Sequence, residues 1–562
     1  MHQSLLTSHK QYVDLETHPC LIMTCNQAVS KHGDMATDSI EGEVIQLLDK
    51  DAFDPTNRAT LTAEELASVI SSKMFVKEKL LPSGKADKIK SRLVARGDQQ
   101  IRELYAGQDL SATTASSMAV LCIIAIAVYE KRKVKSADIG GAYLNAGMSD
   151  TGPQVLMRIE PRLAAIMIQR DPRFSKSLGP KGDIIVRLKK CLYGCIESAK
   201  RWQDHITAFL TSLGYKKNIY EPCVMNKTDK SGCQITVVIY VDDLLITCVH
   251  QDSIDELIQA IKVKYKEVKH STGTTIDYLG MTIDMSVAGQ ASITMDGMTE
   301  AIVQDSNCPT LEKKTSSPAT DDLFDATVDP NPLSAGDMKH FHNIVARLAY
   351  LARLTRPELL LAVSYLVTRV TRSTDGDLAK LHRAIRYLHQ SHASGHRGIV
   401  LRPKHLMAAG WMDASYATHE NLKSHSACNL SIGDAAFVSN NSTCQSIITK
   451  SSTEAELVCV SDNANRLIHL VWFMTAQGHK QHAAIIYQDN MSSMALLQKG
   501  RSTSTKSKHI AVRFFWIKEQ LDSGLVQLQF RPTAMMGPAN LLTKPLQGAQ
   551  FVEERLQLTG WK

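Results

Sequence analysis

ITVVIYVDDLLITCV, residues 235–249, is the stretch on which the fold of this chain depends. Two apolar runs rich in Ile, Val and Leu flank a polar centre, Tyr240-Val241-Asp242-Asp243. Such runs are typical of β-strands with a buried face, and the short polar centre predicts a tight turn between them. Asp242 and Asp243 raise each other's pKa unless a cation meets them. The stretch therefore predicts a hairpin whose tip either binds Mg²⁺ or is a plain solvated turn.

A third carboxylate, Asp138, lies about a hundred residues upstream, in a strand-like segment at 134–139. The glycines that follow it let the backbone turn tightly. Three carboxylates can hold two Mg²⁺ ions about 4 Å apart, which stabilise the attacking and leaving oxygens of a phosphoryl transfer. Because adjacent strand residues face opposite sides, we expect Asp138 and Asp242 to be direct ligands and Asp243 to be the weaker one.

Length and charge bound the class of protein. The 562 residues exceed what one hydrophobic core supports, so two to four lobes are expected. The net charge of +7 is a mild indication of a polyanionic partner. Its location is more informative, because residues 73–102 hold nine basic residues against three acids, and residues 499–513 hold five against none.

The cysteines and apolar runs exclude several other classes. The 12 cysteines show neither CxxC pairs nor finger-type spacing, which indicates no zinc site and no disulfide framework and fits reduced thiols inside a cell. The longest apolar run, residues 118–129, is too short to cross a bilayer and predicts a buried helix. The N-terminus has no signal-peptide pattern, so we expect no membrane role.

The remaining pattern predicts a mixture of helices and strands. Residues 405–562 alternate between the two and predict a separate α/β unit, with a helix from 452 and strands at 484–488 and 526–532. Further upstream we expect strands at 73–81, 87–97, 184–188 and 276–283, and helices at 116–130, 191–213, 253–265, 337–354, 357–372 and 376–389.

Several segments, in order and spacing, resemble the copia-type LTR-retrotransposon reverse transcriptases. Five belong to the polymerase part of that family: KIKSRLVARG (88–97), SADIGGAYLN (136–145), RLKKCLYGCIESAKRW (187–202), YVDDLLIT (240–247) and DYLGMTI (277–283). ARLAYLARLTRPELLLAVSYL (346–366) resembles the segment that follows their polymerase. Five more resemble their ribonuclease H (RNase H) domain: GWMDASYA (410–417), SSTEAEL (451–457), IYQDN (486–490), KSKHIAVRF (506–514) and ANLLTKPL (539–546).

The resemblance implies an α+β fold: a right-hand polymerase with fingers, palm and thumb, followed by a C-terminal α/β RNase H-like domain. On this basis we expect a poorly defined lead-in at 1–60 and fingers and palm at 61–290. A thumb or connection would occupy 291–404, with a Pro/Ser/Thr/Asp-rich linker near 309–336, and the RNase H-like domain 405–562.

The resemblance also implies roles for individual polymerase residues. Asp138, Asp242 and Asp243 match the metal-binding, catalytic carboxylates. Lys90 and Arg92 lie in the fingers strand that contacts the phosphates of the incoming nucleotide, where a cation neutralises charge in the transition state; a solvated strand face is the alternative.

Two further matches concern the nucleotide pocket. Tyr143 occupies the aromatic position that excludes a 2′-hydroxyl, although a single Tyr is more often a core residue. Gly194 matches the glycine of the LYG turn beside the nucleotide.

For RNase H, the resemblance implies Asp413, Glu456 and Asp489 as catalytic, metal-binding carboxylates, with Glu454 as a substitute for Glu456. Thr453-x-x-Glu456 is also a capping box, so Glu456 could instead stabilise a helix start. The nucleic-acid contacts would come from Lys508, His509 and Arg513, for which a solvated helix face is the alternative.

Two departures from the family pattern put activity in doubt. Asn540 stands where the family has its fourth RNase H carboxylate, which removes a charge from the metal site. Glu197, in the segment 197–200 where the family has Gln-Ser-Pro-Arg, would put a repulsive carboxylate near the template or nucleotide.

The resulting hypothesis is an RNA-directed DNA polymerase of a copia-type element with two Mg²⁺ ions per active site, or Mn²⁺ in their place, and an RNase H activity left open. Its partners would be an RNA template, a DNA or tRNA primer, an RNA–DNA hybrid and dNTPs. It would act in the cytoplasm, within a virus-like particle, or in the nucleus. The rival hypothesis is a catalytically inactive or domesticated fragment that binds nucleic acid.

Overall fold

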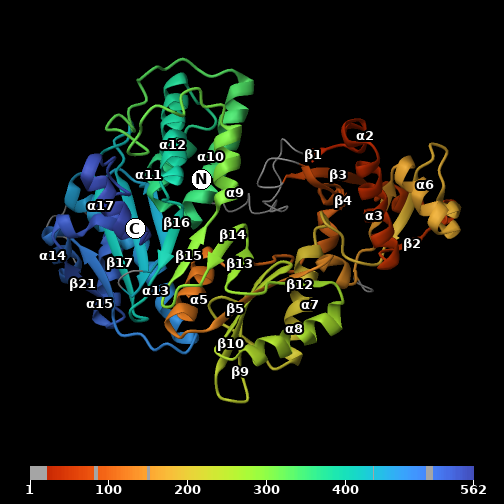
Figure 1. The fold of residues 1–562 in the computed structure, drawn as a ribbon, viewed down its shortest axis with the longest axis horizontal. Helices are drawn as coiled ribbons and strands as arrows, with labels where there is room; N and C mark the ends of the chain where they lie inside the picture. Colours follow the sequence, from red (N-terminus) through yellow and green to blue (C-terminus); the bar gives the residue numbers. More distant parts are fainter. Residues whose placement is uncertain (1–21, 81–85, 149–151, 434–435, 501–510, 562) are drawn as a thin grey trace.

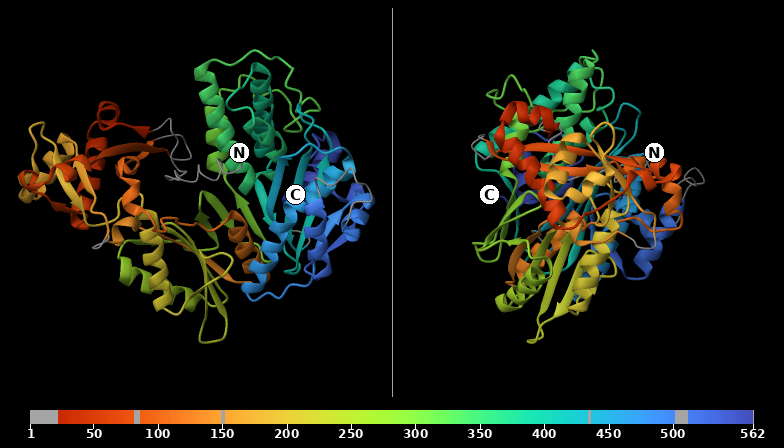
Figure 2. Two further views of the ribbon diagram at one scale, coloured as in Figure 1. Left: turned by 180° about the vertical axis from the view of Figure 1, so that it is seen from behind. Right: turned by 90° about the vertical axis from the view of Figure 1, so that its right-hand side faces the viewer.

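The computed structural model describes residues 22–80, 86–148, 152–433, 436–500 and 511–561. The described residues form a mixed α and β structure with four sheets. Figures 1 and 2 show one lobe built from the N-terminal segments and a larger body built from the C-terminal half, with a central sheet bridging them. Within the described residues no helix is long and apolar enough to cross a membrane.

The N-terminal sheet has the strand order β1-β3-β6-β7-β2, with β4 paired to β3. Its longest strands, β3 (Ile70–Leu80) and β4 (Ala86–Ala95), form the expected basic pair. The other strands are β1 (Ile22–Met23), β2 (Phe53–Pro55), β6 (Leu156–Ile159) and β7 (Ile184–Leu188). Helices α2 (Cys25–His32), α3 (Asp34–Asp49), α4 (Ala63–Ala67) and α6 (Pro161–Arg170) belong to the same lobe.

The expectation of a poorly defined lead-in at 1–60 is wrong from Ile22 onward. Helix α2 has a complete capping box at Thr24, and α3 buries Ile40, Val44 and Leu47. The apolar positions of α3 are separated by polar residues, so the composition of this segment does not indicate a buried helix. Residues 22–60 are therefore part of the N-terminal lobe.

The central sheet has the order β12-β5-β11-β10-β9-β8. The predicted hairpin is present as β10 (Gln234–Tyr240) and β11 (Asp243–Cys248), and the predicted upstream strand as β5 (Lys133–Ile139). The edges are β8 (Lys216–Lys217), β9 (Val224–Thr228) and β12 (Val268–His270). The predicted buried helix is α5 (Ser117–Tyr129), and α7 (Ser198–Ser212) and α8 (Gln251–Tyr265) complete this part.

The third sheet has the order β13-β14-β15-β16 and corrects one prediction. Residues 276–283 were expected to form one strand, but they form a hairpin of β13 (Thr275–Tyr278) and β14 (Met281–Asp284). Leu279 and Gly280 both have positive φ, as a two-residue hairpin turn requires. The apolar alternation continues through the turn and so conceals it.

The rest of the third sheet and a group of helices follow. β15 is Ala291–Thr294 and β16 is Gly398–Leu401. Residues 307–331 contain no helix or strand. The predicted helix at 357–372 is shorter than expected, because a 3₁₀ turn precedes α11 (Leu360–Val367). The other helices are α9 (Asp296–Asp305), α10 (Ala335–Leu354) and α12 (Asp375–Ala393).

The C-terminal sheet has the order β19-β18-β17-β20-β21, antiparallel from β19 to β17 and parallel from β17 to β21. Its strands are β17 (Ala408–Ser415), β18 (His425–Ile432), β19 (Phe437–Cys444), β20 (Ala484–Gln488) and β21 (Val526–Phe530). The associated helices are α13 (Ser452–Ala476), α14 (Met491–Lys499), α15 (Ala511–Asp522), α16 (Gly537–Asn540) and α17 (Gly548–Thr559).

The central and C-terminal sheets share one hydrophobic core. Helix α5 is buried along almost its whole length and contacts β11 of the central sheet, β15 and β16 of the third sheet and β19 of the C-terminal sheet. At the surface of this junction, the rings of Tyr220 and Trp472 stack with centroids 5.4 Å apart. Asn218 Nδ2 also donates to the Phe473 carbonyl oxygen at 3.4 Å. The N-terminal lobe has a separate core.

Candidate active sites

The central sheet brings the three predicted carboxylates to one end. Asp138 on β5 lies directly opposite Asp243 on β11, and Asp242 lies in the turn between β10 and β11. The Ile139 amide donates to the Asp242 carbonyl oxygen at 3.1 Å, which ties the turn to β5. Directly opposite residues of an antiparallel pair share a face, so the register pairs Asp138 with Asp243. Sequence alternation alone had favoured Asp242 for that position, because it does not determine register.

A lysine that the sequence did not single out extends this row. Lys269 on β12 lies opposite Asp138 on the other side of β5, so Asp243, Asp138 and Lys269 occupy one row across three strands. Only the strand pairing reveals this neighbour, because β12 is three residues long and follows a helix.

The acidic turn is held by a buried tryptophan. Val241 has a φ of +56°, which is costly for a β-branched residue and is sustained only when the surroundings enforce it. Trp202 on α7 is 1% exposed, and its Nε1 donates to the Val241 carbonyl oxygen at 2.7 Å. The indole thus holds the carbonyl next to Asp242 in a single position.

The predicted phosphate-contacting residues lie on β4. Lys90 lies opposite Lys77 of β3, and Arg92 lies opposite Phe75. Arg92 Nη1 forms an ion pair with Glu43 Oε2 of α3 at 2.9 Å. Burial raises the pKa of Glu43, and the Arg92 charge opposes that rise. Sequence reasoning missed Glu43 because it lies in the segment taken as a lead-in.

Tyr143 contacts Tyr193, and the next residue, Gly194, approaches the end of β4. The rings of Tyr143 and Tyr193 make an edge contact at 4.6 Å, and the Arg92 guanidinium carbon lies 6.0 Å from the Tyr193 ring centre. Gly194 has a φ of +93°, and a Cβ there would lie 2.1 Å from the Ala95 carbonyl oxygen. Glycine is therefore required for the turn to approach β4 this closely.

Glu197 corrects an expectation. It was expected to place a repulsive carboxylate near the template or nucleotide, but it is 2% exposed. Tyr105 OH donates to its Oε1 at 3.1 Å, and Gln100 Nε2 donates to its Oε2 at 3.2 Å. Burial, followed by the Glu197 charge, raises the pKa of Tyr105. The carboxylate is a satisfied internal group that joins α7 to the segment after β4.

The C-terminal sheet assembles the second predicted set. Asp413 is on β17, Glu456 on α13 and Asp489 directly after β20. Carboxylate oxygens of all three lie within 4.8 Å of one another, a spacing that suits a metal ion. Asp413 and Glu456 are 1% and 5% exposed.

The electrostatics of this cluster favour a cation. Burial and the charges of Asp413 and Asp489 raise the pKa of Glu456 well above its usual range, and burial raises that of Asp413. Lys544 Nζ, 3.5 Å from Asp413 Oδ2, and the Thr543 hydroxyl, which donates to the same oxygen, oppose the rise in Asp413. Like charges gathered in a buried site are stabilised by a divalent ion.

The start of α13 separates the roles of its two glutamates. The helix begins at Ser452, and the Ser451 hydroxyl accepts from the Glu454 amide at 3.2 Å. Glu454 Oε2 in turn accepts from the Lys450 amide at 2.8 Å. The capping interpretation of Glu456 is therefore wrong, because Ser451 and Glu454 cap the helix and Glu456 lies a turn inside it.

Asn540 is buried and holds neighbouring segments together. Its Nδ2 donates to the Thr533 carbonyl oxygen at 2.8 Å, and its Oδ1 accepts from Lys544 Nζ at 3.3 Å. The Thr533 hydroxyl donates to Asp489 Oδ2 at 2.7 Å, so Asn540 is connected to the carboxylate cluster through both neighbours.

The predicted nucleic-acid contacts are only partly described. Lys508 and His509 lie outside the described residues. Arg513 on α15 forms an ion pair with Asp462 of α13, and its side chain is 25% exposed.

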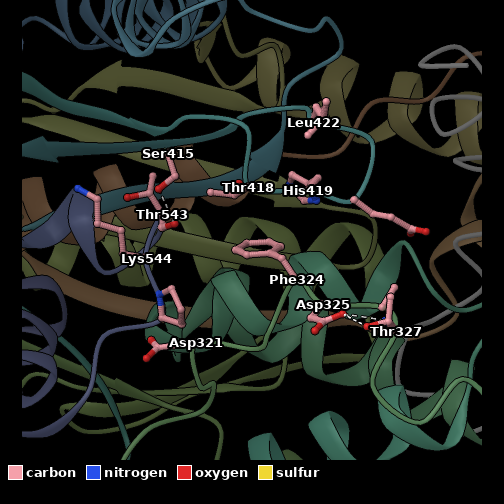
Figure 3. A pocket seen from close by; sticks show the side chains of 13 residues that line it. Asp321, Phe324, Asp325, Thr327, Ser415, Thr418, His419, Leu422, Thr543 and Lys544 are labelled. Atoms are coloured by element: carbon pink, nitrogen blue, oxygen red, sulfur yellow. Dashed lines mark hydrogen bonds between the residues drawn. The ribbon is translucent and has the colours of Figure 1, made fainter.

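A cavity of about 630 Å³ adjoins the carboxylate cluster. Ser415, Thr543 and Lys544 form the wall nearest Asp413, and Figure 3 shows Phe324 between these residues and His419. Asp321 and Asp325, from the segment before α10, also line the cavity. The predicted linker therefore helps to build the surroundings of the second site.

Comparison with known sequences adds to this geometry. Residues 67–318 match the sequence model of the reverse transcriptase (RNA-dependent DNA polymerase) family. The chain is 24% identical over 492 residues to the "Retrovirus-related Pol polyprotein from transposon RE2" of Arabidopsis thaliana. It is 23% identical over 469 residues to the corresponding polyprotein from transposon TNT 1-94 of Nicotiana tabacum. These matches cover 86% and 82% of this chain but 31% and 33% of the polyproteins, so the chain spans about a third of their length.

Two solved structures share the fold. The foamy viral protease-reverse transcriptase dRH in complex with ds DNA aligns with a TM-score of 0.51 at 12% identity, over 89% of this chain and 70% of that one. The foamy viral protease-reverse transcriptase in complex with RNA/DNA hybrid aligns with a TM-score of 0.50 at 11% identity, over 89% of this chain and 54% of that one. The predicted α+β fold is confirmed.

Proposed function

We propose that this chain, which belongs to the reverse transcriptase family of retrotransposon Pol polyproteins, is an RNA-directed DNA polymerase that extends a primer along an RNA template. One observation carries the proposal: the register of the central sheet sets Asp138 opposite Asp243, beside the turn that holds Asp242. Three hard oxygen donors at one end of a sheet suit Mg²⁺.

In this proposal the metal ions stabilise charge and the chain holds the carboxylates in position. When bound, paired Mg²⁺ ions stabilise charge on the attacking and leaving oxygens of nucleotidyl transfer. The chain contributes rigidity, because Trp202 fixes the Val241 carbonyl and the Ile139 amide fixes that of Asp242. Carboxylates that are already in position need little reorganisation when the substrate binds.

Lys90, Arg92, Tyr143 and Gly194 form the nucleotide side of the proposed site. Arg92, oriented by Glu43, faces the Tyr193 ring that Tyr143 also contacts. In this proposal the side chains of Lys90 and Arg92 bind the triphosphate of a dNTP, and Tyr143 lies against the sugar of that nucleotide. Gly194 lets the intervening turn approach β4.

The second proposed activity is hydrolysis of the RNA strand of an RNA–DNA hybrid at Asp413, Glu456 and Asp489. It is supported by the spacing of their oxygens, within 4.8 Å, and by the burial of Asp413 and Glu456. The amide of Asn540 gives this site less negative charge than four carboxylates would, which weakens its hold on divalent ions.

Primer extension on an RNA template with Mg²⁺ tests the polymerase proposal. Asp242→Asn removes a charged ligand and is expected to lower incorporation by about 100-fold or more, comparable to the loss of one preorganised charge-stabilising group. Asp252→Asn, at an exposed position in the first turn of α8, is the matched control and should extend primers like the wild type. Binding of template–primer by Asp242→Asn should remain close to that of the wild type.

The rival hypothesis predicts a different result. A catalytically inactive fragment that binds nucleic acid would bind template–primer but extend nothing, whether or not Asp242 is intact. Wild-type protein that binds hybrid without any incorporation, in Mg²⁺ or Mn²⁺, would therefore favour the rival over the polymerase.

A further inference from the structure

A cluster of three possible metal ligands lies at the end of the β10–β11 hairpin that is opposite to the turn holding Asp242. Asp229, Cys233 and His250 each offer a ligand atom, and these atoms lie within 4.8 Å of one another. Asp229 follows β9, Cys233 precedes β10, and His250 precedes α8. The cluster contains a carboxylate, a thiol and an imidazole, which distinguishes it from the all-carboxylate sites.

The strand register explains why these residues meet. Gln234 on β10 lies opposite Thr228 on β9, and Thr236 lies opposite Thr247 on β11. Continuing both registers by one or a few residues sets Cys233 opposite Asp229 on one side and opposite His250 on the other. Residues opposite one another share a face, so the three side chains form one row across three strands.

The carboxylate of this row is firmly oriented. Asp229 Oδ1 accepts from the backbone amides of Ser231 and Cys233 at 2.9 and 2.8 Å. Its Oδ2 accepts from the Ser253 hydroxyl at 3.0 Å and lies 2.8 Å from His250 Nδ1. Hydrogen bonds of this kind orient a ligand before a metal binds. They leave the Asp229 side chain 6% exposed, whereas that of His250 is 42% exposed.

The Cys233 thiol adds a third ligand atom to the hydrogen-bonded pair of Asp229 and His250. Tetrahedral zinc takes thiolate, imidazole and carboxylate ligands at about 2.0–2.3 Å, which sets ligand atoms about 3.3–3.8 Å apart. In the structure the ligand atoms of Asp229, Cys233 and His250 lie within 4.8 Å of one another, close to that range. The exposed side of His250 leaves room for a water molecule as the fourth ligand, and the Cys248 thiol, 3.8 Å from Asp229 Oδ2, adds a second sulfur nearby.

We propose that Asp229, Cys233 and His250 form a zinc site that fastens the outer end of the β9–β10–β11 hairpins to the start of α8. Binding replaces the thiol proton of Cys233 with the metal ion, and the proton passes to solvent. The sequence pattern concealed this site, because its ligand spacing matches no zinc-finger motif and depends on strand pairing. The site is independent of the polymerase and RNase H proposals.

Cobalt substitution in the complete, chelator-stripped chain tests the proposal. A thiolate bound to Co²⁺ gives a charge-transfer band in the near ultraviolet, whereas the carboxylate clusters at Asp138 and Asp413 would give none. The wild type is expected to show this band at one equivalent of Co²⁺ and to lose it when Zn²⁺ is added. Cys233→Ser should abolish the band, and His250→Gln should lower the affinity for Zn²⁺ by more than about tenfold.

Cys308→Ser is the matched control, because Cys308 is also partly exposed but lies far along the chain, between α9 and the linker. It should keep the wild-type band and affinity. Circular dichroism of the stripped proteins checks that each variant is folded. The absence of a band in the wild type, or a band that persists in folded Cys233→Ser, would overturn the proposal.

Discussion

The amide of Asn540 and the ammonium of Lys544 together decide the charge of the second carboxylate site. Lys544 Nζ lies 3.5 Å from Asp413 Oδ2 and 3.3 Å from Asn540 Oδ1, so the cation is shared between them. In the metal-free protein this lysine offsets part of the repulsion among the buried carboxylates. The same ammonium opposes the binding of a divalent ion, and the neutral amide of Asn540 does not compensate for it.

Asn540→Asp should therefore increase RNA release from a labelled hybrid, most clearly at limiting Mg²⁺, because the new carboxylate would pair with Lys544 and add a fourth negative charge. The variant should also be less stable by about 1–3 kcal/mol, since the hydrogen bond from Asn540 Nδ2 to the Thr533 carbonyl is replaced by two facing oxygens. Hydrolysis rates across a Mg²⁺ titration and thermal unfolding measure the two effects.

Asn421→Asp, at an exposed loop position, is the control and should change neither quantity. Unchanged hydrolysis in folded Asn540→Asp at every Mg²⁺ concentration would show that the missing charge does not limit the site.

At the scale of elements, strand pairing determines which residues meet. Sequence periodicity predicted β5, β10, β11, α5 and α8 because each has a continuous apolar pattern. It missed α3, whose core positions are separated by polar residues, and it missed the turn at Leu279-Gly280 inside an uninterrupted alternation. Periodicity does not determine strand register, so the residue opposite Asp138 and the row containing Cys233 could not be predicted from it. The resemblance to a family supplied the site residues that periodicity could not.

The contact between the Gly194 turn and β4 gives an element-scale prediction. Gly194→Ala should destabilise the N-terminal lobe by at least about 1–2 kcal/mol from the left-handed backbone alone, and by more because its Cβ would lie 2.1 Å from a backbone oxygen. The displaced turn should also raise the KM for dNTP in primer extension. Thermal unfolding and steady-state kinetics provide the readouts.

Gly232→Ala separates the two causes, because Gly232 has a φ of +83° but nothing lies within 4 Å of a Cβ added there. It should show the smaller, purely conformational loss and a normal KM. Equal destabilisation of the two variants would mean that the close approach to β4 does not matter.

At the scale of the whole molecule, the central and C-terminal sheets behave as one body. They share a core through α5, and the stacked pair of Tyr220 and Trp472 closes the surface of the junction. Independent domains within one chain usually meet through smaller, more polar interfaces. The helix pattern of α5 predicted its burial, but nothing in the sequence indicated that β19 would cover part of it.

Tyr220→Ala should weaken both parts together. Loss of the aromatic pair is expected to cost about 0.5–1.5 kcal/mol beyond the buried area, and hydrogen exchange should speed up in β9 and in α13 alike. Ile219→Ala, at a neighbouring position that is 76% exposed, should leave both rates unchanged. Faster exchange in β9 with no change in α13 would indicate two separately folding units.

The shared core has a consequence for any duplex that touches both carboxylate groups. Continuous packing through α5 joins the central and C-terminal sheets. The distance between the carboxylates at Asp242 and those at Asp413 is therefore fixed by the fold. A duplex bound at both carboxylate groups would contact them at two points separated by that fixed distance. With the two proposed activities, cuts in the template would follow the growing primer end at a constant distance in base pairs.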